Sequence, residues 1–223
     1  MIAFIADIHG NLPALEAVFE DLKKYPVSRI YSLGDVAGYY PFINETIELL
    51  KENNVEHILG NHDNYLANDI DCSRSSKVNH TINYQRNNIS KDNLLWLKDS
   101  PSYLDEDAFF AVHGGINDYL EEYSSGIYFP ESVKQNLFLC AHTHIQKYAV
   151  LEGKCFCNPG SVGQPRDGDP RAAYALFDED KGISLCRVKY DIGYIAKAMS
   201  ERGFSPDYYT NLYVGEPIGG RRN

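Results

Sequence analysis

The first ten residues constrain the fold of this chain more than any other stretch. Residues 1–6 are all apolar, and the run is closed by Asp7, His9 and Gly10. A short apolar run that ends at a turn residue is typical of a strand buried on both faces. Such a strand would deliver a carboxylate and an imidazole to the carboxyl end of a sheet, which is half of a divalent metal site. Taken alone, the Asp-x-His pair is also compatible with a simple strand-end cap.

Four later apolar stretches end in residues of the same kind. Their polar ends are Asp35, then Asn61, His62 and Asp63, then His113, and finally His142 with His144. Five of the seven histidines in the chain therefore lie at predicted strand ends. Histidines with purely structural roles have no reason to recur there, and open α/β sheets place their sites at the carboxyl edge. The five stretches together predict one site to which each contributes side chains.

The order of elements predicts an α+β fold whose first half is α/β-like. Up to residue 59, apolar strands alternate with helical patterns, which implies parallel strands joined by right-handed crossovers. The expected strands are 1–6, 29–33 and 56–59, and the expected helices are one between Asn11 and Pro26 and one capped by Asn44.

Helical patterns replace strands at about residues 64–99, which we predict to be an insert over one edge of the site. Short strands dominate the second half, from 103 to 188, and a final helix is expected at 192–202. We therefore expect residues 1–223 to form a single domain of two sheets packed face to face, with helices outside.

Composition limits the partners and the compartment. The formal net charge is −10, with 31 acidic and 21 basic residues, and an acidic surface disfavours a long polyanion such as DNA or RNA. Five cysteines without framework spacing argue for a reducing compartment rather than a disulfide scaffold. The N-terminus has no basic n-region, and no apolar run approaches the roughly 18 residues of a membrane span. We expect a soluble, cytoplasmic protein.

These motifs, in this order, resemble the calcineurin-like metallophosphoesterase superfamily. Its pattern is Asp-x-His, Gly-Asp, Gly-Asn-His-Asp/Glu, a lone His and Gly-His-x-His, and the chain has a counterpart of each between Asp7 and His144. The one departure is Ala141, where the family usually has glycine. Residues 158–166 and 81–97 further resemble the small prokaryotic phosphodiesterase branch.

The resemblance implies a four-layer α-β-β-α sandwich and a site for two divalent metal ions. Asp7, His9 and His144 would hold one ion, and Asn61, His113 and His142 would hold the other. Asp35 would bridge both, since two cations about 3.5–4 Å apart need an anion between them. Nitrogen and oxygen donors without thiolate suit manganese, iron, zinc, nickel or cobalt. We expect manganese.

The resemblance also implies a general acid at the Gly-Asn-His-Asp motif. His62 directly follows the expected ligand Asn61 and would face the substrate, where it protonates the leaving group or stabilises developing charge. Asp63 would orient that imidazole. His57 and His80 belong to no motif and are expected to be structural.

Substrate contacts are expected from three parts of the rim: the aromatic loop at 39–42, the helical insert, and the loop that ends at Arg166. Either Arg166 or Arg171 would meet a phosphate. Tyr39 and Tyr40 would stack on a nucleobase, although packing under the insert explains them equally well. On the insert itself, Lys77 and Arg86 are expected to be solvated.

The leading hypothesis is a two-metal phosphodiesterase that acts on a small phosphorylated substrate, such as a nucleotide diester or a dinucleoside polyphosphate. Few cations accompany the motifs, which favours a diester over a dianionic monoester. A phosphomonoesterase or protein phosphatase stays an alternative. So does a non-catalytic binding module on the same fold, in which the counterpart of His62 is typically missing. The sequence leaves the natural substrate and the oligomeric state open.

Overall fold

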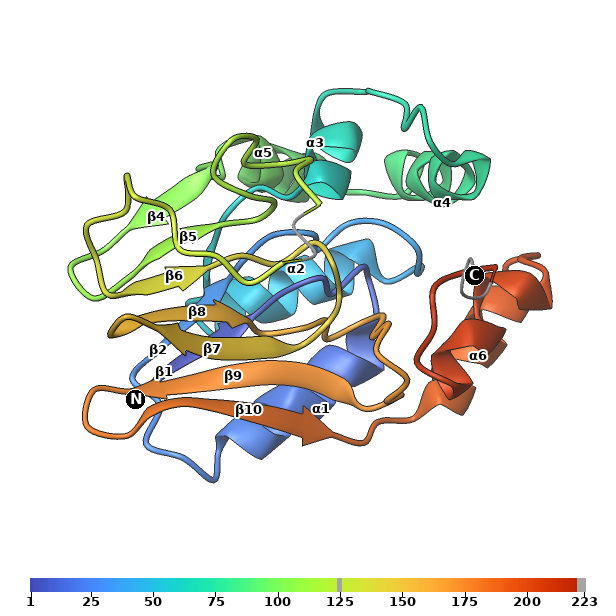
Figure 1. The fold of residues 1–223 in the computed structure, drawn as a ribbon. Coiled ribbons are helices and arrows are strands. Elements are labelled where there is room, and N and C mark those ends of the chain that lie inside the picture. The colour runs from blue at the N-terminus through green and yellow to red at the C-terminus, as the bar shows by residue number, and fades with distance from the viewer. Residues whose placement is uncertain (124–125, 220–223) are drawn as a thin grey trace.

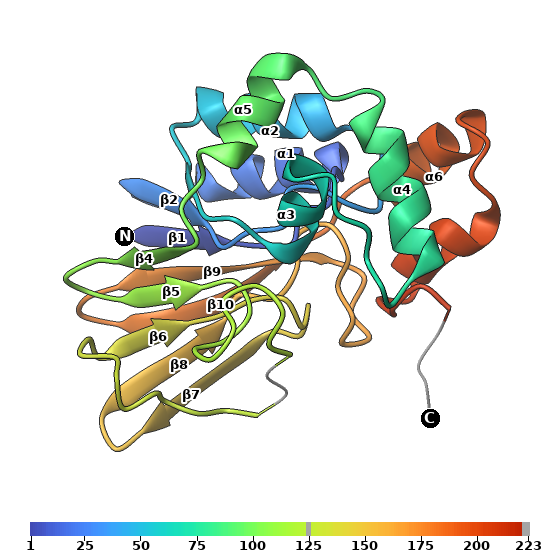
Figure 2. The ribbon, with the colours of Figure 1, turned by 90° about the horizontal axis from the view of Figure 1, so that it is seen from above.

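Two five-stranded sheets pack face to face in the computed structural model, which describes residues 1–123 and 126–219 (Figures 1 and 2). The first sheet has the order β10-β9-β1-β2-β3, and the second has the order β4-β5-β6-β8-β7. The first contains β1 (Ile2–Ile5), β2 (Arg29–Ser32), β3 (Glu56–His57), β9 (Ala172–Asp178) and β10 (Gly182–Val188). The second contains β4 (Tyr103–Asp105), β5 (Phe110–Val112), β6 (Leu137–Leu139), β7 (Lys147–Leu151) and β8 (Lys154–Asn158).

Both sheets are mixed. Strands β1, β2 and β3 run parallel, as the strand–helix alternation predicted, whereas β9 and β10 are antiparallel additions. In the second sheet β5, β6 and β8 run parallel, and the edge strands β4 and β7 are antiparallel to their neighbours. The predicted α+β sandwich of two mixed sheets is confirmed.

The helices lie on the side of the first sheet (Figure 2). In the described residues they are α1 (Leu12–Leu22), α2 (Ile43–Glu52), α3 (Asn61–Ala67), α4 (Ser76–Arg86), α5 (Lys91–Lys98) and α6 (Ile192–Glu201). Over the described ranges, every helix is too short or too polar to cross a membrane. On the outer face of the second sheet, Ile116, Tyr128 and Phe129 pack against the cluster that contains Phe138.

Strand β1 lies at the centre of the first sheet and is buried on both faces, as its apolar sequence predicted. Phe4 faces the second sheet, while Ala3 and Ile5 face the layer that contains α1. The carboxyl end of β1 therefore lies between the two sheets. Asp7 follows it, close to the ends of β2, β3, β5 and β6.

Two helix starts differ from the prediction. Helix α3 begins at Asn61, because Gly60 takes the N-cap position and the Asp63 carboxylate at N3 accepts the Gly60 N–H. The expected site residues 61–63 thus form its first turn. Helix α2 begins at Ile43, and Asn44 does not cap it. The Asn44 side chain instead accepts the backbone N–H of Ser90, which ties α2 to the start of α5.

The C-terminal segment continues from α6 through the short helices η1 (Pro206–Tyr208) and η2 (Thr210–Tyr213). It packs on α4, where Lys77 forms an ion pair with Asp207 at 2.5 Å and His80 Nδ1 lies 2.9 Å from the Tyr208 hydroxyl. Lys77 and His80 therefore face this segment rather than the strand ends. That the whole chain is a single domain stays a prediction.

Candidate metal centre

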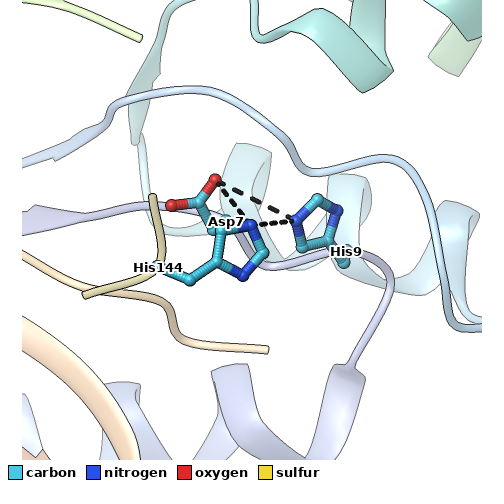
Figure 3. Close-up of side chains that lie close together, drawn as sticks. All are labelled: Asp7, His9 and His144. Atoms are coloured by element: carbon cyan, nitrogen blue, oxygen red, sulfur yellow. Dashed lines mark hydrogen bonds and ion pairs between the residues drawn. The ribbon is translucent and has the colours of Figure 1, made fainter. Parts of the chain in front are cut away.

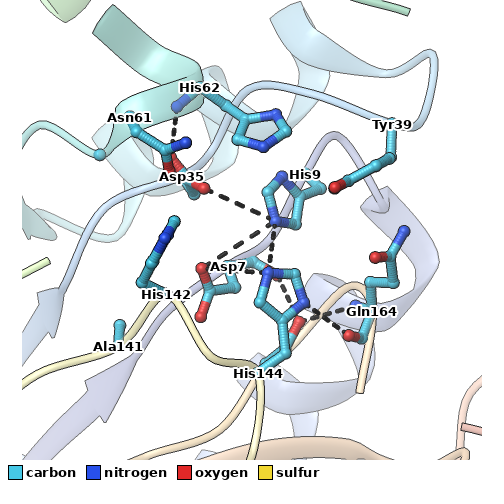
Figure 4. A network of polar contacts seen from close by, with 12 residues as sticks. Asp7, His9, Asp35, Tyr39, Asn61, His62, Ala141, His142, His144 and Gln164 are labelled. Atoms are coloured by element: carbon cyan, nitrogen blue, oxygen red, sulfur yellow. Dashed lines mark hydrogen bonds and ion pairs between the residues drawn. The ribbon is translucent and has the colours of Figure 1, made fainter. Parts of the chain in front are cut away.

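The turns after the central strands bring the seven expected metal ligands into one buried cluster. Figure 4 labels all of them except His113. Each follows a strand or begins the helix behind it, and none is more than 7% exposed. The set is Asp7, His9, Asp35, Asn61, His113, His142 and His144. Residues more than 130 positions apart in the sequence thus meet, because parallel strands of both sheets end at the same edge.

Five of these residues hold a backbone conformation that non-glycine residues rarely adopt. The φ angles of Asp7, His9, Asp35, His142 and His144 are 51°, 53°, 58°, 62° and 59°. Each such residue costs roughly 1–2 kcal/mol. Strain of this kind persists where the surroundings over-determine it, and it clusters at functional sites. The repetition of one strained turn at three strand ends therefore marks this edge as the functional one.

Three of the imidazoles are fixed in the same tautomer by backbone carbonyls. In each, Nδ1 lies 2.6–2.8 Å from a carbonyl oxygen: His9 to Ala37, His113 to Leu33, and His144 to Gln164. Because a carbonyl oxygen can only accept, Nδ1 of each ring carries a proton. Each Nε2 then faces the centre of the cluster as the atom that can bind a metal.

The first group of donors consists of Asp7, His9 and His144 (Figure 3). The Nε2 atoms of the two histidines are 3.1 Å apart, and Asp7 Oδ1 lies 3.5 Å from the nearer one. Both Asp7 oxygens are buried without a hydrogen-bond partner. Lone pairs that converge on one point repel one another unless a cation lies among them. The donor set therefore fits a divalent metal ion.

The second group consists of Asp35, His113 and His142, with Asn61 beside it. His113 Nε2 lies 3.4 Å from Asp35 Oδ2, 3.2 Å from His142 Nδ1 and 3.1 Å from Asn61 Oδ1. The Asn61 amide nitrogen is 3.4 Å from the Tyr65 hydroxyl, which leaves its oxygen for the centre. Two nitrogens and two oxygens again face one point.

Asp35 lies between the two groups. Its Oδ2 is 3.7 Å from His9 Nε2 in the first group and 3.4 Å from His113 Nε2 in the second. Its Oδ1 accepts the backbone N–H of His62 at 2.8 Å, which fixes the rotation of the carboxylate. One oxygen is thus directed at both groups, as a bridging ligand requires.

Protonation in the cluster follows from burial and from its internal charges. Burial lowers the pKa of His9 far below its usual value and that of His142 to about 2, so both rings are neutral. Burial raises the pKa of Asp7 to about 8. At His113 burial is outweighed by the Asp35 carboxylate, which raises the pKa to about 10. Because metal ligands must be deprotonated, a metal ion would displace protons from Asp7 and His113.

His62 lies beside the cluster and lines the same pocket as Asp35, His142 and His144. Its ring centroid is 4.8 Å from that of His9, and its side chain is 6% exposed. Burial lowers its pKa, so the ring is neutral. It is therefore placed beside the candidate ligands, with a face toward the pocket.

Asp63 has a different role from the one expected. Its oxygens accept the backbone N–H groups of Asp35, Ala37 and Gly60 at 2.7, 2.8 and 2.9 Å. A further contact at 3.1 Å joins it to His57 Nε2, so the buried His57 supports this carboxylate. Asp63 makes no hydrogen bond to His62. The expectation that it orients the His62 imidazole is corrected: as the N3 residue of α3, it points back at the loop.

The pocket above the cluster has a volume of about 190 Å³, and Arg166 is one of its walls. The guanidinium donates to the Tyr39 hydroxyl at 3.0 Å and to Gln164 Oε1 at 2.6 Å. In the part of the chain that the structure describes, no carboxylate forms an ion pair with it. A positive charge held beside a pocket by neutral partners is suited to an anionic ligand. Arg171, the other arginine considered, instead pairs with Asp169.

The aromatic loop contributes less than expected. Tyr40 is 1% exposed, and its hydroxyl accepts a hydrogen bond from Gln164, so it cannot stack on a ligand. Tyr39 lines the pocket but is 9% exposed, with its ring against His9.

The insert reaches the pocket through residues that the sequence reasoning missed. They are Cys72, Arg74, Ser75 and Val78, and Tyr123 joins them from the segment after β5. Ser75 caps α4 by accepting the N–H of Val78. As an N-cap candidate, this serine was the only signal in the sequence for any of these pocket residues. Arg86, expected to be solvated, donates instead to the carbonyls of Tyr65 and Ile70.

Comparison with known proteins identifies the family. Residues 1–182 match the model of the calcineurin-like phosphoesterase superfamily domain. The chain belongs to this superfamily. Membership implies divalent metal ions, and the two groups of donors described above fit them.

Three relatives of this family member show how far the likeness extends. An uncharacterized protein of Methanocaldococcus jannaschii is 34% identical over 86% of this chain and 88% of its own length. The phosphodiesterase YfcE of Escherichia coli is 26% identical over 80% of this chain and 88% of its own length. A metallophosphoesterase from Sphaerobacter thermophilus, solved by crystallography, is 31% identical with a TM-score of 0.80, covering 96% and 98% of the two chains. The predicted superfamily and its small prokaryotic branch are confirmed, and they support a hydrolase.

Proposed function

We propose that this chain is a phosphodiesterase that binds two divalent metal ions at the cluster. The observation that carries the proposal is the convergence of two sets of buried nitrogen and oxygen donors on either side of Asp35, with both oxygens of Asp7 left without a hydrogen-bond partner. Asp7, His9 and His144 would hold one ion, and Asn61, His113 and His142 the other. Manganese is the proposed ion, and iron, zinc, nickel and cobalt also suit these donors.

The residues around the cluster have different roles in the proposed reaction. The bound ions would polarise the phosphoryl oxygens and lower the pKa of the attacking water. Arg166 binds a phosphoryl oxygen from the pocket wall, which fixes the substrate relative to the ligands. His62 would donate a proton to the leaving oxygen; because its ring is neutral in the empty site, this role requires it to take up a proton when the anionic substrate binds. Asp63 acts indirectly, since it holds the backbone that carries Asp35 and Ala37.

A diester is the favoured substrate class because the pocket has few free cations. Arg74, the second arginine of the pocket, is paired with Glu121, so Arg166 is left as the cation without an acidic partner among the described residues. A monoester dianion needs more compensating charge than a diester monoanion. The similarity to the phosphodiesterase YfcE supports the same choice. We further propose that the substrates are small, because a formal charge of −10 disfavours binding of long nucleic acids. We also propose a cytoplasmic location, because five cysteines without framework spacing suit a reducing compartment.

A paired substrate comparison tests the substrate class. With Mn²⁺ present, kcat/KM should be at least about 10-fold higher for a nitrophenyl alkyl phosphodiester than for nitrophenyl phosphate, a difference of about 1.4 kcal/mol in transition-state binding. Both substrates release nitrophenolate, so the chemistry of the leaving group is matched. A preference for the monoester would refute the diester assignment and leave the metal site untouched. Absence of hydrolysis with every metal and substrate would favour the binding-module alternative.

Metal addition should stabilise the protein, because the folded cluster binds the ions and the unfolded chain does not. At 100 times the dissociation constant, one site contributes about 2.7 kcal/mol. For a chain of this size, that corresponds to a rise in Tm of about 5–11 °C. Differential scanning fluorimetry of chelated protein, with Mn²⁺ added back, measures the rise, and Mg²⁺ at equal concentration is the comparison. No rise with any transition metal would contradict a metal centre here.

A further inference from the structure

Gln85 is a fully buried amide at a position where the helix pattern calls for an apolar residue. Along α4 the buried face is formed by Val78, Thr81, Ile82 and Gln85, which follow one another at helical spacing. Gln85 has an exposed fraction of 0%. A buried polar side chain in an apolar stripe is informative, since its burial is costly unless every polar atom is paired.

Every polar atom of that amide bonds to the loop that carries Tyr39. Oε1 accepts the backbone N–H of Gly38 at 2.7 Å. Nε2 donates to the carbonyls of Gly38 and Tyr40 at 2.9 and 2.7 Å. Only a primary amide offers one acceptor and two donors in this arrangement; a carboxylate would set an acceptor against two carbonyls. The contact thus depends on the primary amide of glutamine and not merely on the size of the side chain.

The loop held by Gln85 is in turn the support of two site histidines. The carbonyl of Ala37 accepts the Nδ1 proton of His9 at 2.6 Å and so fixes the ring with Nε2 toward the cluster. At Gly38 a Cβ atom would lie 2.4 Å from His62 Nδ1 and 2.9 Å from His9 Nδ1, so the loop backbone is pressed against both rings. A small shift of this loop would therefore move both imidazoles.

We propose that Gln85 is a positioning residue through which the helical insert fixes the positions of His9 and His62 in the site. Its amide holds the backbone from Gly38 to Tyr40, and this backbone keeps His9 in its ligand tautomer and His62 at its distance from the cluster. The same helix lines the pocket with Val78. Helix α4 therefore links the pocket wall to the ligands as one rigid piece. The effect on metal binding rests on the proposed function, whereas the effect on the His9 ring does not.

Three variants test the proposal. Gln85→Met keeps the volume and removes all three hydrogen bonds, and Gln85→Glu keeps only the acceptor. Thr81→Val is the matched control: Thr81 is 2% exposed on the same face of α4, and its hydroxyl bonds only to carbonyls of its own helix. Circular dichroism and thermal melting establish that each protein is folded.

The first readout is the NMR signal of the hydrogen-bonded His9 Nδ1 proton in metal-free protein. We expect this protected signal in the wild type and in Thr81→Val, and its loss in both Gln85 variants. The second readout is Mn²⁺ affinity by titration, which should fall about 10–100-fold in the Gln85 variants alone, as for other residues that orient metal ligands.

Each outcome decides. An unchanged His9 signal together with unchanged Mn²⁺ affinity in either folded Gln85 variant would overturn the proposal. An equal loss in Thr81→Val would overturn it too, since the cause would then be general destabilisation of α4. If the wild type itself binds no metal, the proposed function fails, and the His9 signal still decides the role of Gln85.

Discussion

Asp35→Asn should release both metal ions and reduce turnover of a phosphodiester by at least about 10²-fold. The reason is geometric, because Asp35 Oδ2 faces His9 Nε2 in one group of donors and His113 Nε2 in the other. An amide nitrogen in that place would present protons to both, and the negative charge between two cations would be lost. Each ion supplies several kcal/mol of charge stabilisation in the transition state, and 1.36 kcal/mol is tenfold in rate.

The measurement is the metal content of unchelated protein together with kcat. Wild-type protein should approach two ions per chain, and the variant should fall well below one. Asp191→Asn is the control, since it makes the same chemical change at the N-cap of α6, where asparagine caps as well as aspartate. Retention of one tightly bound ion in Asp35→Asn, with little loss of activity, would show that Asp35 is not a shared ligand.

Local pattern was enough to predict that these ligand-type residues lie close together. A buried strand such as β1 has an unbroken apolar sequence, and the first residue that departs from it, Asp7, marks the strand end. Because β1, β2 and β3 run parallel, their ends are adjacent whatever the detailed packing. The ligand-type residues at those ends therefore had to meet, and the prediction needed no knowledge of side-chain direction.

Side-chain partners across the chain could not be predicted in this way. Gln85 bonds to Gly38 and Tyr40 over a separation of more than 40 residues, and a single polar residue in an amphipathic helix does not reveal its partner. Tyr40 and Tyr39 are neighbours in sequence, yet packing buries Tyr40 and leaves Tyr39 at the pocket wall. Such outcomes depend on how the helical insert packs on the loop that carries Tyr39 and Tyr40. The hydrophobic periodicity of the sequence does not predict that packing.

The direction of Asp63 was missed for a local reason. The sequence Gly60 to Asp63 satisfies the spacing of a capping box once α3 begins at Asn61, and a carboxylate at N3 turns back toward the N-cap. The role expected for Asp63 came from its place next to His62 in the sequence, and adjacency in sequence does not fix the direction of a side chain. Because the helical pattern was expected only from about residue 64, Asp63 was not recognised as the N3 residue of a helix.

His62→Ala should keep the fold and both metal ions while kcat for a diester with an alkoxide leaving group falls about 10²–10⁴-fold. The side chain lines the pocket and has no hydrogen-bonded partner at Nδ1. Its backbone N–H, which bonds to Asp35, survives the substitution. An alkoxide leaving group needs a proton as the bond to phosphorus breaks, and removing the proton donor leaves its negative charge uncompensated.

The dependence on leaving group separates proton donation from other roles of His62. Nitrophenolate is stable as an anion, so the variant should lose far less activity on a nitrophenyl diester than on an alkyl one, and KM should change little for either. His80→Ala is the matched control, because His80 is an exposed histidine of the insert whose ring packs on Phe204 and Tyr208 outside the pocket. An equal loss on both diesters would indicate that His62 stabilises charge on the phosphoryl group instead. Loss of metal would place His62 among the ligands, as its proximity to His9 and Asp35 permits.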